Sequence, residues 1–558
     1  MFDALFTTTT EYKKLSHALS GKGACALFGL PASGRAQVYA ALCRQLDKPL
    51  CIVTPGEAEA TRFAADLNTL GIPAAVFPAR DYVLRPIEGT AREYEYRRLA
   101  VLGELVGGRL RAVAVPAEAL TQFTTPKEDF CANTRALHAG DTLLRDDLLA
   151  ALFGAGYTRR AQVDGPGQFS VRGDIVDIFA PDQKMPVRME FWGDEIDTLH
   201  TFDLTTQRRE DAIDKFYLSP AREVLFGKPA DAAEQLQAFL AKQRGKKKTA
   251  MADCMAADLD LLDGGAVPVN MDKYLAVRYP HPATVLDYFD DPILVAEEPA
   301  SIREADRATV YRRGEELKSL ILDGVLCAGL DNLYADPSYL WSKTGHYRTI
   351  CAENFARSMP DQPLKDIINA PAHTLPAWNG EVAGLLEDLK PLCDAGYTVT
   401  LLAGTDRAAA GLARDLRDKG ILVTTDAAAA PAAGLVQVLA GHLSTGCEFP
   451  FAKYALLTGR AFGETSSQKK KRKKAKDALN SLTEITPGDL VVHQNHGIGR
   501  YAGIQRMAVQ GVTKDYLRIE YDKKDVLYVP VTQLDLLSRY TAPGDSENVK
   551  LSRLGGAE

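Results

Sequence analysis

The segment ACALFGLPASGRAQVYAAL (residues 24–42) decides the fold, because it has the shape of a phosphate-binding loop. An apolar stretch at 25–28 predicts a strand, the glycine-rich segment 29–34 predicts a turn, and apolar residues at helical spacing follow. A working loop reads GxxxxGK[ST]: its backbone amides cradle phosphates, its Lys reaches the β and γ oxygens, and its hydroxyl binds Mg²⁺. We therefore predict a strand, turn and helix of nucleotide-binding type.

The residues of this loop lack the usual chemistry. In the frame GLPASGRA, Gly29 and Gly34 keep the two glycines, but Arg35 stands in place of Lys and Ala36 offers no oxygen to a metal. A planar guanidinium does not replace the point charge of an ammonium group. We predict a degenerate nucleotide site with no catalytic residues, and a binding platform rather than an ATPase.

A second apolar stretch, ILVAEEP (residues 293–299), resembles a Walker B strand, in which acids at the strand end hold Mg²⁺. Glu297 and Glu298 occupy the place of the usual Asp-Glu pair. The longer arm of Glu297 displaces the metal position, and the loop supplies no opposing ligand. This stretch therefore also favours a fold retained without ATP hydrolysis.

Length and composition set the broad class. A chain of 558 residues is long enough for several domains, and a net charge of −7 argues against general nucleic-acid binding. The nine cysteines are scattered without a CxxC pair, which favours reduced thiols over disulfides or a zinc framework. No signal sequence or long apolar run is present, so we expect a cytoplasmic protein without membrane contact.

The pattern along the chain predicts a multidomain α/β protein. Alternating strands and helices up to residue 125 predict a parallel sheet, and a mostly helical segment with a basic loop at 244–248 covers 218–343. A second α/β unit is expected at 344–463. The expected strands and helices of these units are 50–54, 58–70, 74–77, 111–115, 398–402, 407–419, 421–425, 435–439 and 454–457.

An inserted α+β unit is predicted at 126–217, where strands alternate in polarity. The odd positions from Phe169 to Phe179, Asp177 among them, read as one face. Arg172, Arg188, Glu190 and Trp192 would face the other way. An outward Trp flanked by Arg is typical of a binding hot spot, but a Trp covered by another domain explains the pattern equally well.

The last part of the chain combines a charged linker with a β-rich unit. The Lys-rich run at 464–482 reads as a solvated linker, although it could touch DNA phosphates weakly. About six short strands at 483–540 predict a small barrel. His493 and His496 lie three residues apart, but no third ligand with suitable spacing is nearby. We predict a turn or strand role for them and no metal site.

Several motifs together are similar to the bacterial transcription-repair coupling factor family. GLPASGRA, the segment 167–208 (GQFSVRGDIVDIF and PVRMEFWGDEIDTLHTFDLTTQR) and ATVLDYFDDPILVAEEP (283–299) resemble the UvrB-homology module. HQNHGIGRYAG (493–503) and YLRIEYDKKDVLYVPV (516–531) resemble the CarD-like, Tudor-type domain that binds RNA polymerase. The order of these motifs on one chain is more specific than any one of them.

The resemblance implies a domain plan that covers the whole chain. Its parts are UvrB-like domain 1a with the degenerate P-loop (1–125), the UvrA-binding domain 2 (126–217), domain 1b (218–343), the third domain (344–463), the Lys-rich linker (464–482), the CarD-like domain (483–540) and a lead-in to the translocase (541–558).

The resemblance also implies partners and contact residues. The partners are UvrA and the RNA polymerase β subunit. The UvrA face would consist of Arg172, Arg188, Glu190 and Trp192, and the polymerase contact of Ile504, Arg506, Met507 and Val509 on a strand whose edge could pair with a partner's sheet. The family's translocase, with its ATP, Mg²⁺ and most of its DNA contacts, would lie beyond residue 558, so we expect an N-terminal piece that needs no cofactor of its own.

Two other functions remain open at this point. The chain could be a UvrB-like ATPase that acts on damaged DNA, although Arg35, Ala36 and the lack of a long aromatic hairpin between residues 80–82 and 92–94 argue against it. It could instead be a CarD-like transcription regulator with an unrelated N-terminal half. ATP turnover would favour the first, and failure to bind UvrA the second.

Overall fold

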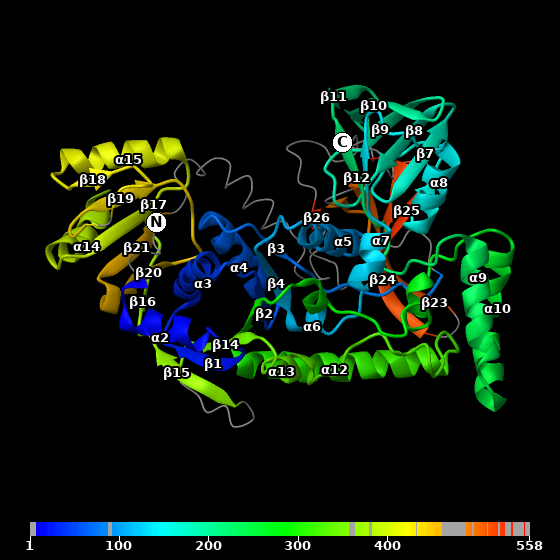
Figure 1. Ribbon diagram of the computed structural model, residues 1–558, viewed down its shortest axis with the longest axis horizontal. Coiled ribbons are helices and arrows are strands. Elements are labelled where there is room, and N and C mark those ends of the chain that lie inside the picture. Colours follow the sequence, from blue (N-terminus) through cyan, green and yellow to red (C-terminus); the bar gives the residue numbers. More distant parts are fainter. Residues whose placement is uncertain are drawn as a thin grey trace.

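The computed structural model describes residues 7–86, 92–355, 363–378, 382–430, 432–459, 487–493, 496–509, 512–522, 525–530, 537–539 and 552. These residues form several sheets with helices packed around them (Figure 1). The predicted Lys-rich linker and all of the lead-in except Ser552 lie outside the described residues.

The N-terminal unit contains a seven-stranded sheet in the order β15-β1-β14-β13-β2-β4-β3, in which every neighbouring pair is parallel. Its central strands are buried along their whole length and are almost entirely apolar, as a helix-covered parallel sheet requires. The predicted parallel sheet is therefore confirmed. The strands are β1 (Gly23–Phe28), β2 (Leu50–Thr54), β3 (Ala74–Val76), β4 (Ala112–Pro116), β13 (Ile293–Glu297), β14 (Arg348–Glu353) and β15 (Leu364–Asn369).

Helices cover both faces of this sheet, and the long helix α12 (Pro299–Leu322) extends away from it (Figure 1). The others are α2 (Thr10–Ala18), α3 (Ala32–Leu46), α4 (Glu57–Thr69), α5 (Glu93–Val106), α6 (Ala117–Leu120), α13 (Tyr339–Lys343) and the 3-10 helix η2 (Val285–Tyr288). Strands β14 and β15 join this sheet although they follow residue 344. The predicted boundary at that residue therefore cuts the sheet.

An antiparallel unit is inserted between β4 and β13. The first and last strands of this unit, β5 (Arg135–His138) and β12 (Lys215–Leu218), pair with each other. The strands that lie between them in the sequence form a six-stranded sheet in the order β11-β10-β9-β8-β7-β6. Its elements are β6 (Thr158–Arg159), β7 (Gln168–Arg172), β8 (Ile175–Phe179), β9 (Val187–Trp192), β10 (Glu195–Phe202), β11 (Arg209–Ala212), α7 (Lys127–Ala132) and α8 (Arg145–Gly154).

The predicted single face from Phe169 to Phe179 is wrong. The chain reverses after Arg172, which pairs with Ile175, and Gly173 in the turn has a φ of +61°. The reversal changes which positions face the core: Val176 and Ile178 are buried there with Phe169, and Asp177 faces the opposite way.

A helical segment leads back toward the first sheet. The predicted basic loop at 244–248 is wrong, because α10 already begins at Gly245 and includes the three lysines in its first turn. One side of this helix is buried through Met251, Met255 and Leu262. This tertiary packing outweighs the unfavourable positive charge at the N-terminus of the helix. The elements are α9 (Pro229–Ala241), α10 (Gly245–Asp263), the 3-10 helix η1 (Met271–Tyr274) and α11 (Leu275–Arg278).

The third unit is a six-stranded mixed sheet in the order β16-β20-β21-β17-β19-β18, in which β21, β17, β19 and β18 are parallel and correspond to the four predicted strands. Its elements are β16 (His373–Leu375), α14 (Val382–Asp394), β17 (Thr398–Leu402), α15 (Asp406–Asp418), β18 (Val423–Thr424), β19 (Val436–Leu439), β20 (Gly446–Phe449), the 3-10 helix η3 (Pro450–Ala452) and β21 (Tyr454–Thr458).

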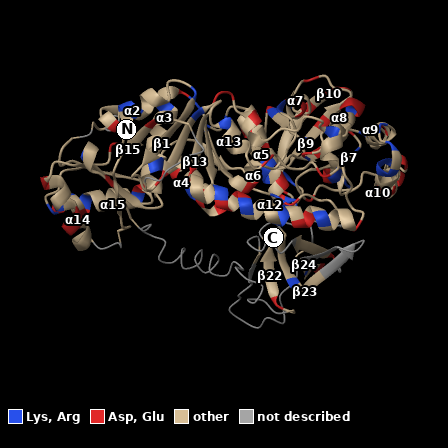
Figure 2. Cartoon of the chain, turned by 90° about the horizontal axis from the view of Figure 1, so that it is seen from below, with Lys and Arg blue, Asp and Glu red and all other residues tan. Residues whose placement is uncertain are grey.

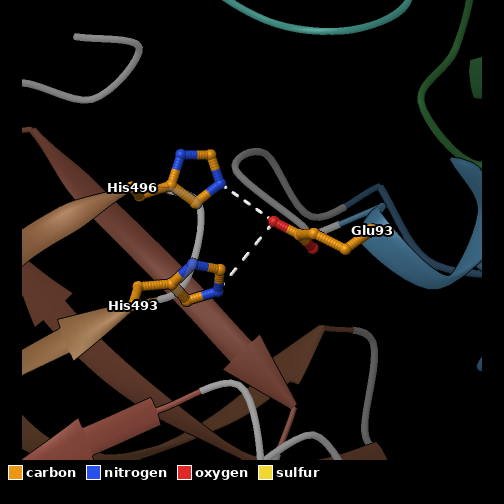
Figure 3. Close-up of side chains that lie close together, drawn as sticks. All are labelled: Glu93, His493 and His496. Carbon is orange, nitrogen blue, oxygen red and sulfur yellow. Dashed lines mark hydrogen bonds and ion pairs between the residues drawn. The ribbon is translucent and has the colours of Figure 1, made fainter. Parts of the chain in front are cut away.

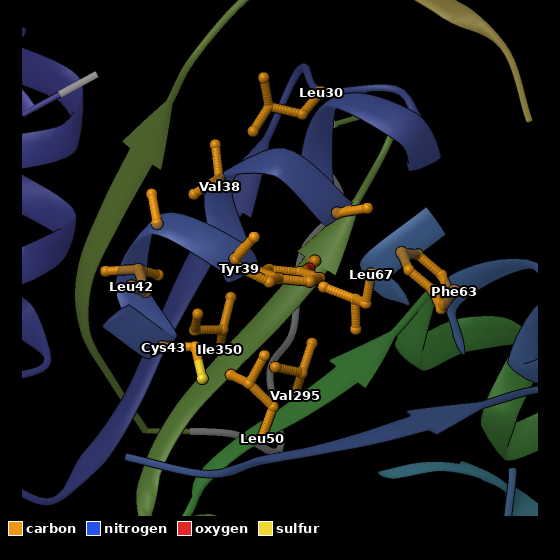
Figure 4. Packing of buried hydrophobic residues seen from close by; sticks show 14 of the residues in the cluster. Leu30, Val38, Tyr39, Leu42, Cys43, Leu50, Phe63, Leu67, Val295 and Ile350 are labelled. Atoms are coloured by element: carbon orange, nitrogen blue, oxygen red, sulfur yellow. The ribbon is translucent and has the colours of Figure 1, made fainter. Parts of the chain in front are cut away.

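One hydrophobic cluster joins this unit to the first. Tyr39 and Leu42 of α3 pack with Val295 and Ile350 of the parallel sheet (Figure 4). Phe449 of β20 belongs to the same cluster, so α3 contacts both sheets.

The C-terminal unit is a five-stranded antiparallel sheet in the order β25-β24-β23-β22-β26. It lies beside the part of the molecule that carries α5 (Figure 2). Within the described part of the chain, none of the helices has the length and apolar character needed to cross a membrane. The strands are β22 (Leu490–His493), β23 (Gly497–Val509), β24 (Val512–Glu520), β25 (Val526–Pro530) and β26 (Leu537–Arg539).

Candidate functional site

The turn after β1 is shorter than the sequence predicts. The helix α3 begins at Ala32, with Pro31 as its N-cap, so Gly34 belongs to the helix and not to a loop. Gly29 has a φ of +87°, and a Cβ at that position would lie 3.1 Å from the carbonyl oxygen of Ala370. A glycine is therefore needed here for the close approach of the chain after β15.

Arg35 is held by the two acids of the Walker B-like strand. Its guanidinium lies 2.9 Å from Glu297 and 2.9 Å from Glu298, and Tyr39 donates a hydrogen bond of 2.5 Å to Glu297. Arg35 and Glu297 are buried. Burial by itself lowers the pKa of Arg35, but Glu297, Tyr39 and Glu298 together outweigh it and the net shift is upward. Arg35 therefore stays charged, and the residues in the Lys and acid positions bind each other.

The third unit covers the N-terminal turn of α3. Ser33 is fully buried, and its Oγ lies 2.8 Å from Thr445 Oγ1. A Cβ at Gly34 would lie 2.9 Å from Cys447 Sγ of β20, and Ala36 is buried in the shared cluster. Protein atoms thus occupy the side of the helix N-terminus where a phosphate would sit in a working loop.

The four predicted UvrA-face residues lie on one face of the six-stranded sheet, as the sequence predicts, but their exposure differs. Val187, Met189 and Phe191 of β9 point into the core, and the alternate residues point outward. Trp192 is 82% exposed, whereas the side chain of Arg188 is only 12% exposed. Arg172 is half exposed, and Glu190, which pairs with Arg209, is partly covered.

Asp177 is the residue that the sequence interpretation placed on the wrong face. Its buried carboxylate accepts hydrogen bonds from Arg188 Nε at 2.7 Å and Nη2 at 2.9 Å, and from Arg172 Nη2 at 2.6 Å. Arg188 also stacks over Phe202 at 4.7 Å. Asp177 thus fixes both arginines, and Trp192 is the member of the set whose side chain is most available. Recognising a tight turn at Gly173 and Asp174 would have revealed this arrangement from the sequence.

The predicted polymerase-contact residues lie on β23. Ile504 is 45% exposed, and the side chains of Arg506, Met507 and Val509 lie outside the described residues. Their backbones pair with β24 on one side. On the other side β22 pairs with residues 497–500, so among the described strands the second half of β23 has a partner on one edge only.

Comparisons with known proteins find two segments that are similar to known domain families. Residues 136–224 match the UvrB interaction domain, and residues 485–541 match the CarD-like/TRCF RID domain. Three transcription-repair-coupling factors match 95% of this chain and 46% of their own length: those of Bacillus subtilis (28% identical over 547 residues), Staphylococcus haemolyticus (27% over 548) and Staphylococcus aureus (25% over 544).

Over almost its whole length the chain is therefore similar to the N-terminal portion of transcription-repair-coupling factors. It spans about half the length of the curated relatives that it matches. Relative to this family, the inserted antiparallel unit corresponds to the UvrB interaction domain and the C-terminal sheet to the CarD-like domain. The first lies between β4 and β13, and the second follows the third unit.

Proposed function

We propose that this chain acts in transcription-repair coupling as a two-ended adaptor that binds UvrA with one unit and the RNA polymerase β subunit with another. The observation that carries this proposal is the presence of a UvrB interaction domain at 136–224 and a CarD-like/TRCF RID domain at 485–541 on one chain. By bringing UvrA to a stalled polymerase, the adaptor would direct excision repair to the lesion.

The UvrA contact is proposed at the outer face of β7 and β9. Trp192 would be the main contact, because a large exposed aromatic side chain beside arginines is typical of an interface hot spot. Arg172 and Glu190 would contribute at its side, and Arg188 would act mainly by keeping the two strands together through Asp177.

Replacement of Trp192 tests this contact. Trp192→Ala is expected to weaken UvrA binding by at least about 2 kcal/mol, or about 30-fold, because hot-spot aromatics contribute this much. The matched control is Tyr311→Ala on α12, which removes another aromatic side chain, 75% exposed, from outside this face. Unchanged affinity of the folded Trp192 variant, measured by isothermal titration calorimetry, would refute the assignment.

The polymerase contact is proposed on the second half of β23, around Ile504, Arg506, Met507 and Val509. An exposed strand edge can add a partner's strand through main-chain hydrogen bonds, with side-chain contacts giving specificity. Ile504→Arg and Met507→Arg would each place a charge in an apolar contact and are expected to weaken binding at least about tenfold.

The control for these variants is Ile367→Arg on β15, which makes the same change at an isoleucine that is 63% exposed. Binding of each variant to the isolated β subunit can be followed by biolayer interferometry. Wild-type affinity in both β23 variants would exclude this strand as the contact.

We further propose that the loop at Gly29–Gly34 is a degenerate P-loop that binds no nucleotide, and that ATP and Mg²⁺ serve a translocase outside this segment. Support comes from the pairing of Arg35 with Glu297 and Glu298 and from the covering of α3 by β20. The barrel form of the CarD-like domain and the domain boundaries other than the one at residue 344 remain proposals as well. Measured ATP turnover by this chain would instead favour the UvrB-like ATPase.

A further inference from the structure

Three potential metal ligands from distant parts of the sequence meet between the first unit and the C-terminal sheet (Figure 3). Glu93 is the first residue of α5, His493 ends β22, and His496 precedes β23. Glu93 Oε1 lies 3.0 Å from His496 Nε2 and 3.9 Å from His493 Nε2. Glu93 lies 403 positions away from His496 in the sequence, so spacing near the histidines gives no sign of this third ligand.

The three side chains form the donor set of a divalent transition-metal site. Their ligand atoms all lie within 4.8 Å of one another. In a tetrahedral zinc site with metal–ligand bonds of about 2.0–2.2 Å, ligand atoms lie about 3.4 Å apart. Shifts of about 1 Å or less would therefore bring these atoms to binding distance. Two imidazoles and one carboxylate suit Zn²⁺ and similar ions, and not Ca²⁺ or Mg²⁺.

The surroundings of the cluster fit a bound ion. Glu93 and His493 are buried, and the second carboxylate oxygen of Glu93, Oε2, is buried without a hydrogen-bond partner among the described residues. The Nε2 atoms of His493 and His496 both lie on the side of Glu93 Oε1, so an ion placed between the three side chains would be within reach of all of them (Figure 3).

An open side of the cluster provides room for a fourth ligand. Glu93 and His496 line a cavity of about 1280 Å³ that extends between the first unit, the inserted unit and the C-terminal sheet. Leu527 of β25 lines the same cavity. A water molecule could complete the coordination from this side, because three protein ligands with one open position are common in zinc sites.

We propose that Glu93, His493 and His496 bind one divalent transition-metal ion, with Zn²⁺ as the ion that best suits this donor set, and that the ion fastens the CarD-like unit to α5. The ion would join the C-terminal unit to the first unit, two parts of the chain that are far apart in the sequence. This proposal rests on the cluster and holds whether or not the partners proposed above are correct.

The test begins with the wild-type chain, stripped of metal with a chelator and titrated with Zn²⁺ against a chromophoric competitor. One equivalent should bind. Glu93→Gln and His496→Ala should each weaken binding by more than about 100-fold, beyond the loss expected for an outer-shell residue. The control His138→Ala removes an exposed histidine that pairs with Asp141 and should leave binding unchanged. Co²⁺ should give the absorption of a tetrahedral ion in the wild type only.

Amide hydrogen exchange tests the fastening. Zn²⁺ should slow exchange both in the first turn of α5 and at residues 496–500 of the wild type, and in neither variant. Failure of the wild type to take up one equivalent would overturn the proposal without reference to any variant. Wild-type affinity in folded Glu93→Gln and His496→Ala would overturn the ligand assignment, and Zn²⁺ binding without slower exchange in α5 would overturn the fastening.

Discussion

At the scale of single residues, Arg35 connects two elements of the first unit. A Lys in this position would reach for phosphate oxygens, whereas Arg35 forms a buried ion pair with Glu297 and a second pair with Glu298. Tyr39 completes the arrangement by donating to Glu297. The residue that stands in place of the Lys of a working loop therefore connects α3 with β13.

Removing Arg35 should be costly, because it leaves the Glu297 carboxylate buried without its cationic partner. We expect Arg35→Ala to lower the free energy of unfolding by about 3–5 kcal/mol, as for other broken buried pairs. Arg97→Ala is the control: it breaks an exposed pair with Glu57 at 3.7 Å and should cost less than about 1 kcal/mol. Urea denaturation followed by circular dichroism measures both. Equal, small losses would show that the buried pair contributes little.

The residue scale also shows what the sequence can predict. The outward position of Trp192 follows from the alternation along β9, because every second residue of a half-buried strand faces the same way. The position of Asp177 does not follow from alternation across an unrecognised turn. Glu93 could not be assigned to the two histidines from sequence spacing, because only the folded chain brings α5 to β22.

At the scale of elements, the turn between β7 and β8 decides which residues form the proposed UvrA face. Gly173 has a φ of +61°, a conformation that costs other residues about 1–2 kcal/mol. This turn sets the register that pairs Arg172 with Ile175 and places Asp177 opposite Arg188. A longer turn would change the register and move the carboxylate away from the arginines.

Two glycine substitutions test the left-handed turn at Gly173, because they should change the free energy of unfolding in opposite directions. A Cβ would meet no atom within 4 Å at Gly173 or at Gly314 in α12, so neither change creates a clash. Gly173→Ala should lower the free energy of unfolding by about 1 kcal/mol because of its left-handed conformation. Gly314→Ala should raise it by about 0.5–1 kcal/mol because alanine favours a helix. Two shifts of the same sign in chemical denaturation would contradict this account.

Elements were predictable where one physical signal dominated. Most of the parallel strands in the first and third units follow from short apolar runs between helical segments, and the observed bounds of β2 and β17 equal the predicted ones. The start of α10 was missed because three consecutive lysines read as a solvated loop. Burial of Met251 and Met255, which lie one helical turn apart, holds that segment in a helix.

At the scale of the whole molecule, packing between units changes what the local motifs can do. The first turn of α3 would be an anion site in an isolated nucleotide-binding domain, but β20 and Thr445 cover it here. This contact joins the first and third units into one hydrophobic cluster. The sequence predicted both sheets without revealing their contact, because long-range packing leaves no periodic signal in either segment.

The two proposed interaction surfaces lie on different sheets of the same chain. Trp192 belongs to the inserted unit and Ile504 to the C-terminal unit. Each residue lies in a segment that matches a family of interaction domains. An adaptor requires that the two surfaces bind at the same time. Binding that is mutually exclusive would make the chain a switch between partners instead.

The most direct test of the central claim is sedimentation velocity of this chain with purified UvrA and the isolated RNA polymerase β subunit, singly and together, without ATP. The account predicts a complex with each partner and a larger complex that contains all three proteins. Trp192→Ala should remove UvrA alone from the larger complex, and Ile504→Arg should remove the β subunit alone. Failure to bind either partner, or competition between the two, would contradict the adaptor function.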